Sequence, residues 1–468
     1  MATYNETGKT AITLEQLAIS PYRFSHLLDL TIEQEINQHG ALYIKGIVQE
    51  GLKDSYLEEA AFGTNIVVSR EHGGADTVLF DGVVIDIAIY QEGGMYVLEA
   101  CAATHTYLLD MGRKRRSFQD NDMTYHELIK HINKGYEGAN AIATVGNSGI
   151  GDFVIQYDET DWQFLARMAS RFGQGLYPTR DMKGAKYYFG APQFPKACEI
   201  ESPAHRRTID CEGQTPIYWI DSYLMLGLGQ PVVFKSSKCI VRSLKARLEG
   251  GEMVATYELC PAEGLAMPLI MNMALQGVSV SGRVIAVERD EIKVHIDQID
   301  ESQDVGTAHW FAYSTVYSSH DGSGWHCMPE IGDQVRVKFA NADDASCYAV
   351  SSISGYMPEP GKPDRMGDYQ VRYIRNPQGM EIMLTPNEVV IHANNESMII
   401  LKQDGSIAIQ GRASISVTSE NDISISSGNN IALRASERIN ILCGGKAEID
   451  LRSSTGVTSL RGARVITN

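Results

Sequence analysis

Pairs of apolar residues recur every eight residues in the C-terminal part of the chain. The stretch "SISVTSENDISISSGNNIAL" (414–433) holds three of them, in the form Ile-Ser-Val, Ile-Ser-Ile and Ile-Ala-Leu. The members of each pair stand two residues apart, so strand alternation places both on one face. The positions between pairs carry mostly Ser, Asn, Gly, Asp, Glu and Arg, which suit turns and solvated faces. The pattern predicts one short strand and one corner per octad from Ile391 to Val465.

A single octad buries too little surface to be stable alone, so the octads must stack. With two inward residues per octad, the core is thin, and three chains wound around one axis would fill it. We therefore predict an intertwined triple-stranded β-helix over residues 381–468, with a single-chain β-solenoid as the alternative. The predicted core residues are Ile399, Leu401, Ile407, Ile409, Ile415, Val417, Ile423, Ile425, Ile431, Leu433, Ile439 and Ile441.

The rest of the chain reads as a mainly β protein with a few helices. Alternating apolar residues around a Gly93-Gly94 corner predict a β-hairpin. Thr124 with Glu127, and Thr160 with Gln163, form capping-box patterns that predict two amphipathic helices. Short strands with Gly and Asp at their corners predict a small barrel over residues 275–355. The proline-rich stretch that follows predicts a neck linker at 356–380.

Composition excludes several functional classes. The 468 residues are enough for about three domains, and the net charge of −17 argues against nucleic acid as a partner. The first residues form no apolar signal segment, and no run of apolar residues is long enough to span a membrane. Eight scattered cysteines without a C-x-x-C pattern predict reduced thiols. We therefore expect a protein made in the cytoplasm.

Two clusters could carry chemistry, and for both a structural role is favoured. His309, His320, His326 and Cys327 are near in sequence but lack the framed spacing of a metal site or nucleophile pair. We expect no catalytic residue, metal or cofactor. The basic run "GRKRRSF" (112–118) is expected to be a solvated segment or to form salt bridges between subunits.

Several segments, taken in order, resemble the VgrG-like spike proteins of contractile injection systems and phage tails. "RSFQDNDMTYHELIKHI" (116–132) and "FVIQYDETDWQFLARMASRFGQGLYP" (153–178) are similar to hub segments of that family. "SGWHCMPEIGDQVRVKF" (323–339) resembles the OB-fold signature of an aromatic residue, Pro, Gly-Asp and Val. Its residues here are Trp325, Pro329, Gly332, Asp333 and Val335. Together with the octads, these segments carry the resemblance over nearly the whole chain.

The resemblance implies an architecture and a set of partners. Residues 1–270 would form a hub of two tube-like β-barrel subdomains with helical insertions, and 275–355 an OB-fold collar. Three copies would form the central spike at the tip of an inner tube, adapting six-fold tube symmetry to a three-fold needle that punctures envelopes. Expected partners are the inner tube protein, baseplate or hub adaptor proteins, effector cargo and, transiently, the target membrane. A PAAR-like tip protein is expected at the C-terminal end, because the sequence given ends on an octad without a His-x-His apex.

The rival class is an enzyme: a glycan-degrading phage tailspike with a β-helix. It predicts clefts lined by carboxylates and aromatic residues. The thin octads offer no such cleft, and no aromatic residue follows Tyr373. The needle interpretation is therefore preferred.

Overall fold

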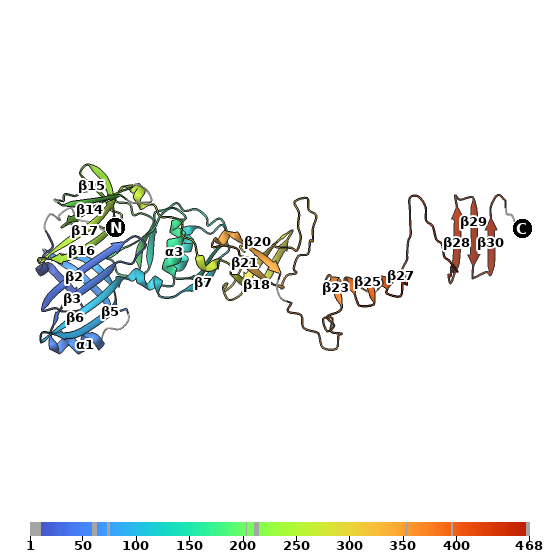
Figure 1. Cartoon of the computed structure of the whole chain (residues 1–468), viewed down its shortest axis with the longest axis horizontal. Helices are drawn as coiled ribbons and strands as arrows, with labels where there is room; N and C mark the ends of the chain where they lie inside the picture. The colour runs from blue at the N-terminus through green and yellow to red at the C-terminus, as the bar shows by residue number, and fades with distance from the viewer. Residues whose placement is uncertain are drawn as a thin grey trace. The chain divides into compact units, whose positions relative to one another are not determined.

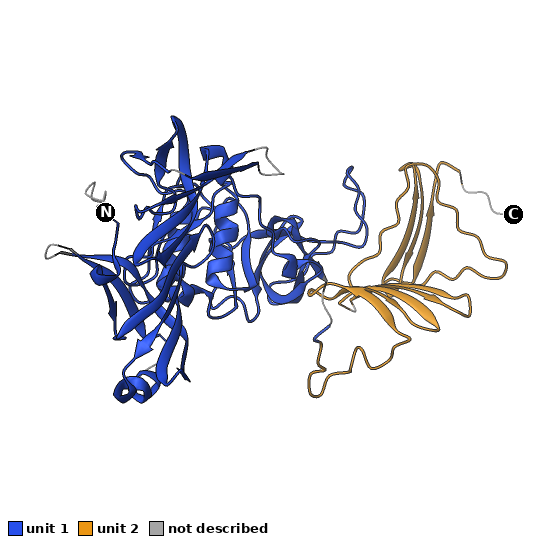
Figure 2. Cartoon of the chain, turned by 60° about the vertical axis from the view of Figure 1, so that its left-hand side comes forward, with its two compact units in different colours: residues 1–355 blue, residues 356–468 orange. Residues whose placement is uncertain are grey.

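The computed structural model describes residues 11–58, 63–72, 75–202, 204–209, 215–351, 354–394 and 396–464. The protein is mainly β, as predicted. It divides into two compact units, 1–355 and 356–468, which Figure 2 shows in different colours. The finer division into hub, collar, neck and needle stays a prediction.

A twelve-stranded sheet dominates the first unit. Its main path runs through β1 (Leu17–Ser20), β4 (Asn65–His72), β5 (Ala75–Glu92), β6 (Met95–Thr104), β3 (Ala41–Val48), β2 (His26–Glu35), β16 (Ser237–Glu249), β17 (Glu252–Cys260), β14 (Pro216–Ser222) and β13 (His205–Ile209). β15 (Pro231–Phe234) pairs with β16, and β12 (Cys198–Glu199) pairs with β15. Antiparallel pairing of β2 with β16 joins an N-terminal half to a half from 198–260 (Figure 1).

Local sequence explains both the turn and the core of this sheet. The predicted β5–β6 hairpin forms, and its corner residues Gly93 and Gly94 have φ values of 59° and 83°, which favour glycine. Alternate residues of the central strands are fully buried, among them Ile32 on β2 and Ile44 on β3. One continuous apolar cluster spans both halves of the sheet.

A small α/β region lies between the two halves in sequence. It contains η3 (His105–Asp110), β7 (Lys114–Phe118), α2 (Tyr125–Asn133), β8 (Asn140–Ala143), β9 (Val154–Glu159), α3 (Asp161–Ser170), β10 (Leu176–Pro178) and β11 (Lys186–Phe189). Both predicted helices begin at their capping boxes, with Thr124 before α2 and Thr160 before α3. They pack into a second apolar core.

A five-stranded sheet completes the first unit. Its strands are β18 (Ser279–Glu288), β19 (Glu291–Ile296), β20 (Trp310–Ala312), β21 (Gln334–Phe339) and β22 (Cys347–Ser351), in the order β20-β19-β18-β21-β22. A parallel bridge between Tyr313 and Ala349 brings the two ends together. Phe153, which directly precedes β9, and Ile155 on β9 join its core, so this barrel and the α/β region share buried surface.

Short helical segments connect these parts. They are η1 (Leu14–Gln16), η2 (Glu50–Leu52), α1 (Lys53–Glu58), η4 (Ala262–Leu265), η5 (Met273–Leu275) and η6 (Asp344–Ser346). No helix among the described residues is long and apolar enough to cross a membrane. Seven cysteines are free thiols, while Cys211 lies outside the described residues.

The second unit consists of two antiparallel sheets. The first contains β23 (Arg372–Arg375), β24 (Met380–Leu384), β25 (Glu388–Ala393), β26 (Ser397–Lys402) and β27 (Ile407–Gly411), paired in sequence order. The second contains β28 (Arg438–Cys443), β29 (Ala447–Arg452) and β30 (Val457–Arg461). Figure 1 shows the strand-free stretch between them.

The prediction of one strand per octad is wrong for the single chain at three octads. Residues 412–437, all of which the structure describes, form no strand. A strand needs a neighbouring backbone to satisfy its N–H and C=O groups, and this stretch has none within its own chain. Val465, the last octad position, lies outside the described residues.

Candidate functional site

The apolar octad residues of β25–β27 form two parallel rows on one face of their sheet. Ile399 lies opposite both Ile391 and Ile409, and Leu401 lies opposite both Val389 and Ile407. Because Ile399 and Leu401 are two residues apart on one strand, both rows share a face. We call these residues, together with the apolar residues at the later octad positions of the sequence, the apolar ladder.

The apolar ladder is exposed in the single chain. Ile399 and Leu401 are 40% and 41% exposed, and Ile441 is 50% exposed, whereas Ile439 is partly buried. The most exposed members range from 53% for Ile423 to 74% for Ile425, and they are Ile407, Ile409, Ile415, Val417, Ile423, Ile425, Ile431 and Leu433. Full burial of one such side chain contributes about 1.5–3 kcal/mol to stability. Burial of these residues in an assembly would therefore stabilise that assembly strongly. Exposed apolar residues repeated at this regular spacing mark an interaction surface.

On the other face of the same sheet, Glu381 is buried by cations from residues 365–375. Glu381 alternates with Ile382, so it points away from the apolar ladder, and it is only 4% exposed. Its Oε2 accepts hydrogen bonds from Arg365 at 2.9 Å and 3.0 Å and from Arg375 at 3.1 Å. His392 Nε2 lies 3.8 Å from Oε1 of the same carboxylate. The sheet is therefore closed within the chain around Glu381, whereas the apolar octad residues on its other face are exposed.

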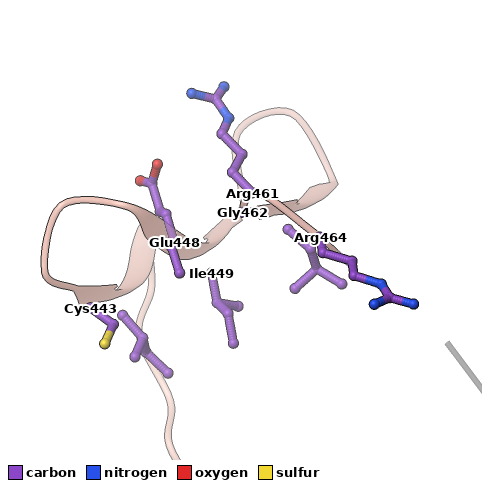
Figure 3. Close-up of a pocket in the computed structure, with 9 residues that line it drawn as sticks. Cys443, Glu448, Ile449, Arg461, Gly462 and Arg464 are labelled. Atoms are coloured by element: carbon purple, nitrogen blue, oxygen red, sulfur yellow. The ribbon is translucent and has the colours of Figure 1, made fainter. Parts of the chain in front are cut away.

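The C-terminal sheet repeats this two-faced arrangement. Ile449 lies opposite Ile441 on one neighbouring strand and Leu460 on the other. These three side chains line a shallow pocket together with Cys443. Figure 3 shows Ile449 and Cys443 pointing to one side, while Glu448 and Arg461 point to the other. The apolar side of this sheet carries the octad residues Ile441 and Ile449, which are 50% and 40% exposed.

The five signature residues of the barrel are divided between a loop and a strand. Trp325 is 48% exposed and lies with Pro329 in the long loop before β21. Gly332 has a φ of 98°, and Asp333 Oδ2 accepts a hydrogen bond from Glu330 N at 2.9 Å, which forms the turn. Val335 then enters the core of the barrel at 2% exposure.

A buried charge cluster joins α3 to the barrel. Arg167, 2% exposed, donates from Nε and Nη2 to the two carboxylate oxygens of Glu159, both at 2.8 Å. Its Nη1 donates to both oxygens of Asp344 on η6 at 3.0 Å. Burial raises the pKa of Glu159, and the Arg167 hydrogen bonds act in the opposite direction. These hydrogen bonds link the barrel to the α/β region.

This charge cluster was not found from the sequence. Arg167 and Asp344 are separated by 177 residues and carry no shared motif. A capping-box helix gives the position of Arg167 but not its partner. Only the shared core of β9 and the barrel brings the two residues together.

Three cations of the basic run at 112–118 form ion pairs within their own chain. Lys114 Nζ lies 2.7 Å from Oδ2 of the fully buried Asp161, and Arg116 also pairs with that carboxylate. Arg115 pairs with Asp158 at 2.9 Å. These contacts form because β7–β9 pairing and the start of α3 place acids beside the run. Arg113 and Arg115 are exposed, as expected of a solvated segment, and a contact with another subunit stays a prediction.

The histidines near the barrel do not gather into a site. His309 packs against Phe153 and Phe311, and burial lowers its pKa. His320, His326 and Cys327 lie on the exposed loop. Within the described ranges, no group of three or more His, Cys, Asp or Glu residues is arranged to hold a metal ion.

Comparisons with known proteins bear on the fold. No protein-family model and no curated protein matches the sequence. The E. coli c3393 structure, described as a type VI secretion component similar to T4 bacteriophage tail proteins gp27 and gp5, matches with a TM-score of 0.53 and 12% identity. That match covers 71% of this chain and 98% of c3393.

A half-lidded Francisella PdpA-VgrG complex matches with a TM-score of 0.51 and 8% identity, over 82% of this chain and 83% of that one. The lidded form of the complex matches with a TM-score of 0.52 and 7% identity, over 82% of this chain and 76% of that one. At these identities the likeness concerns the fold alone. It confirms the resemblance inferred from the sequence: the chain has a fold similar to VgrG-like and phage tail hub-and-spike proteins.

Proposed function

We propose that this chain forms the homotrimeric central spike at the tip of the inner tube of a contractile injection machine. The observation that carries the proposal is the apolar ladder, which is exposed in one chain and regular over ten octads. Three copies facing one axis would bury it and would supply the strand neighbours that 412–437 lacks. The fold likeness to VgrG-like proteins supports the same assembly.

The first unit would act as hub and collar. Its large sheet contains two halves joined through β2 and β16, and in a trimer six such halves would face a six-fold tube. The barrel would follow as an OB-fold collar, which is supported by its strand order and by the Tyr313–Ala349 closure. The buried Arg167 cluster would pass axial force from hub to collar without a flexible joint.

The function is mechanical in this proposal and requires no catalytic step. Made in the cytoplasm, the trimer would join the baseplate through adaptor proteins and be driven through a target envelope on contraction. A PAAR-like tip protein would cap the needle, and effector cargo would travel with it. The rival glycan-degrading activity needs a pair of carboxylates, whereas Glu448 is the sole carboxylate lining the needle pocket and points away from Ile449.

Deletion of residues 380–468 in the producing cell tests the role. We expect the remaining hub and collar to fold, while the particles either fail to assemble or contract without delivering their contents. Electron microscopy of particles and a delivery assay measure the two outcomes. Normal delivery by particles that contain the truncated chain would contradict the proposal.

A further inference from the structure

A basic edge strand stands out on this acidic chain. β13 ends the path of the twelve-stranded sheet, and among the described strands it pairs only with β14. It begins with His205, Arg206 and Arg207, all exposed, in a protein of net charge −17. An exposed strand edge presents unpaired backbone N–H and C=O groups and is a template for another strand.

The cations on this edge are paired with aromatic rings. Arg206 lies opposite Trp219 on β14, with its guanidinium carbon 5.8 Å from the ring centroid. Arg207 lies opposite Tyr218 at the same distance. Among the acids that the structure describes, none forms an ion pair with either arginine; Asp210 and Glu212 lie outside the described residues.

A third cation extends the patch. Lys235, at the turn between β15 and β16, lies with Nζ 2.8 Å from His205 Nε2 and 5.6 Å from the Phe234 centroid. Lys235 and Ser236 both have positive φ values, 48° and 66°, in a turn where glycine or asparagine is usual. Lys235 therefore lies beside β13 even though the positive φ of the turn is unfavourable for a lysine.

The two arginines lie on opposite faces of the β13–β14 ladder, because neighbouring residues of a strand alternate. A strand added at the free edge of β13 would also alternate, so consecutive acidic residues on it would reach Arg206 on one face and Arg207 on the other. A nucleic acid would stack its bases on one face of the β13–β14 ladder and would therefore contact only one of the two arginine–aromatic pairs. We infer that the β13 edge docks an extended, acidic segment of a partner protein by β-strand addition.

Binding of a synthetic strand to the full-length protein tests this inference, which does not depend on the proposed spike function. The probe is a fluorescein-labelled peptide with consecutive glutamates in a valine and threonine background. Comparison peptides have the same composition with a central proline, or lysine in place of glutamate. We expect only the glutamate peptide without proline to bind, because proline removes a backbone donor and the extended pairing.

The decisive variant is the double substitution Arg206→Glu and Arg207→Glu. Arg283→Glu with Arg336→Glu, on an exposed and a partly exposed residue of the barrel, changes the net charge equally. We expect the first variant to weaken peptide binding at least about tenfold and the control to leave it within about twofold. Circular dichroism verifies folding, and Arg207→Gln serves as a milder variant if the double variant unfolds.

Three outcomes would overturn the inference. Equal binding of the proline peptide would show charge attraction without strand addition. Tighter binding of single-stranded oligothymidylate at the same edge would assign the patch to nucleic acid. A changed mass of the Arg206/Arg207 variant, without peptide binding by the parent, would assign the edge to a second copy of this chain.

Discussion

The two compact units of the chain differ in how far they bury their apolar side chains. In the first unit, residues such as Ile32, Ile44 and Val337 are fully buried, and three apolar clusters fill the interior. In the second, Ile407 and Val417 are 68% and 71% exposed although their spacing is more regular than anything in the first. The difference teaches that the first unit carries its core within a single chain, whereas the second leaves its regularly spaced apolar residues exposed.

The same contrast holds for backbone pairing. The strands on the main path of the large sheet in the first unit are all paired antiparallel, while 412–437 has apolar residues at strand spacing but no strand. This stretch lacks both burial of its apolar side chains and backbone pairing, which is what the proposed trimer predicts for one chain by itself. The predictions below test this contrast, from the largest expected effect to the smallest.

Ile423→Asp should abolish assembly while leaving the first unit folded. In a trimer the substitution would bury three unpaired carboxylates around one axis, and each buried charge costs several kcal/mol. Sedimentation velocity measures the mass, and circular dichroism reports the fold. Ser424→Asp, the matched control one residue away, should keep the assembly because it faces outward. Loss of assembly in the control alone would reverse the assignment of faces.

Arg167→Leu should destabilise the first unit by about 3–5 kcal/mol, because it leaves Glu159 and Asp344 buried without their cation. The midpoint of urea unfolding measures this effect. Arg115→Leu removes an exposed ion pair with Asp158 and should cost at most about 1 kcal/mol. Equal effects from the two substitutions would mean that the Arg167 cluster is not a structural joint.

Thr124→Ala should destabilise the first unit by about 1 kcal/mol, since it removes the capping hydroxyl of α2. Thr124→Ser retains the hydroxyl and should be close to the parent. Neither change should alter the mass of the assembly, because α2 belongs to the core formed within one chain. A mass change would place α2 in an interface between copies.

His309 should give the first unit a shallow loss of stability in mild acid. Burial lowers its pKa, so below the ordinary histidine pKa of about 6.5 the unfolded chain binds more protons than the folded one. Its contribution is complete above that pH and declines as the pH falls toward the folded pKa. Unfolding midpoints between pH 7 and pH 5 should fall less steeply for His309→Asn, whereas His320→Asn on the exposed loop should match the parent.

Local sequence patterns predict much of the fold but only part of the candidate site. The Gly93-Gly94 hairpin and the Thr124 and Thr160 helix starts depend on neighbouring residues, so the sequence predicts them directly. The periodicity of Ile399 to Ile441 likewise identifies the ladder. The Arg167–Asp344 joint could not be predicted, because it depends on which distant segments share a core.

Two further features could not be predicted from the sequence, because they also depend on contacts between distant segments. The basic strand at 205–209 becomes an edge only through the order of the whole sheet. The acids beside the 112–118 run, Asp158 and Asp161, become its partners only when β7 pairs with β9. Charge patterns in the sequence therefore predict that these segments are basic, but not which residues pair with them.

Hydrogen exchange at the backbone amides of 412–437, in a sample of known mass, tests the central claim most directly. The account predicts particles of three times the 51.6 kDa chain mass, in which these amides are protected, and loss of that protection in the Ile423→Asp monomer. Protected amides in a 51.6 kDa species would contradict it, as would unprotected amides in an intact trimer.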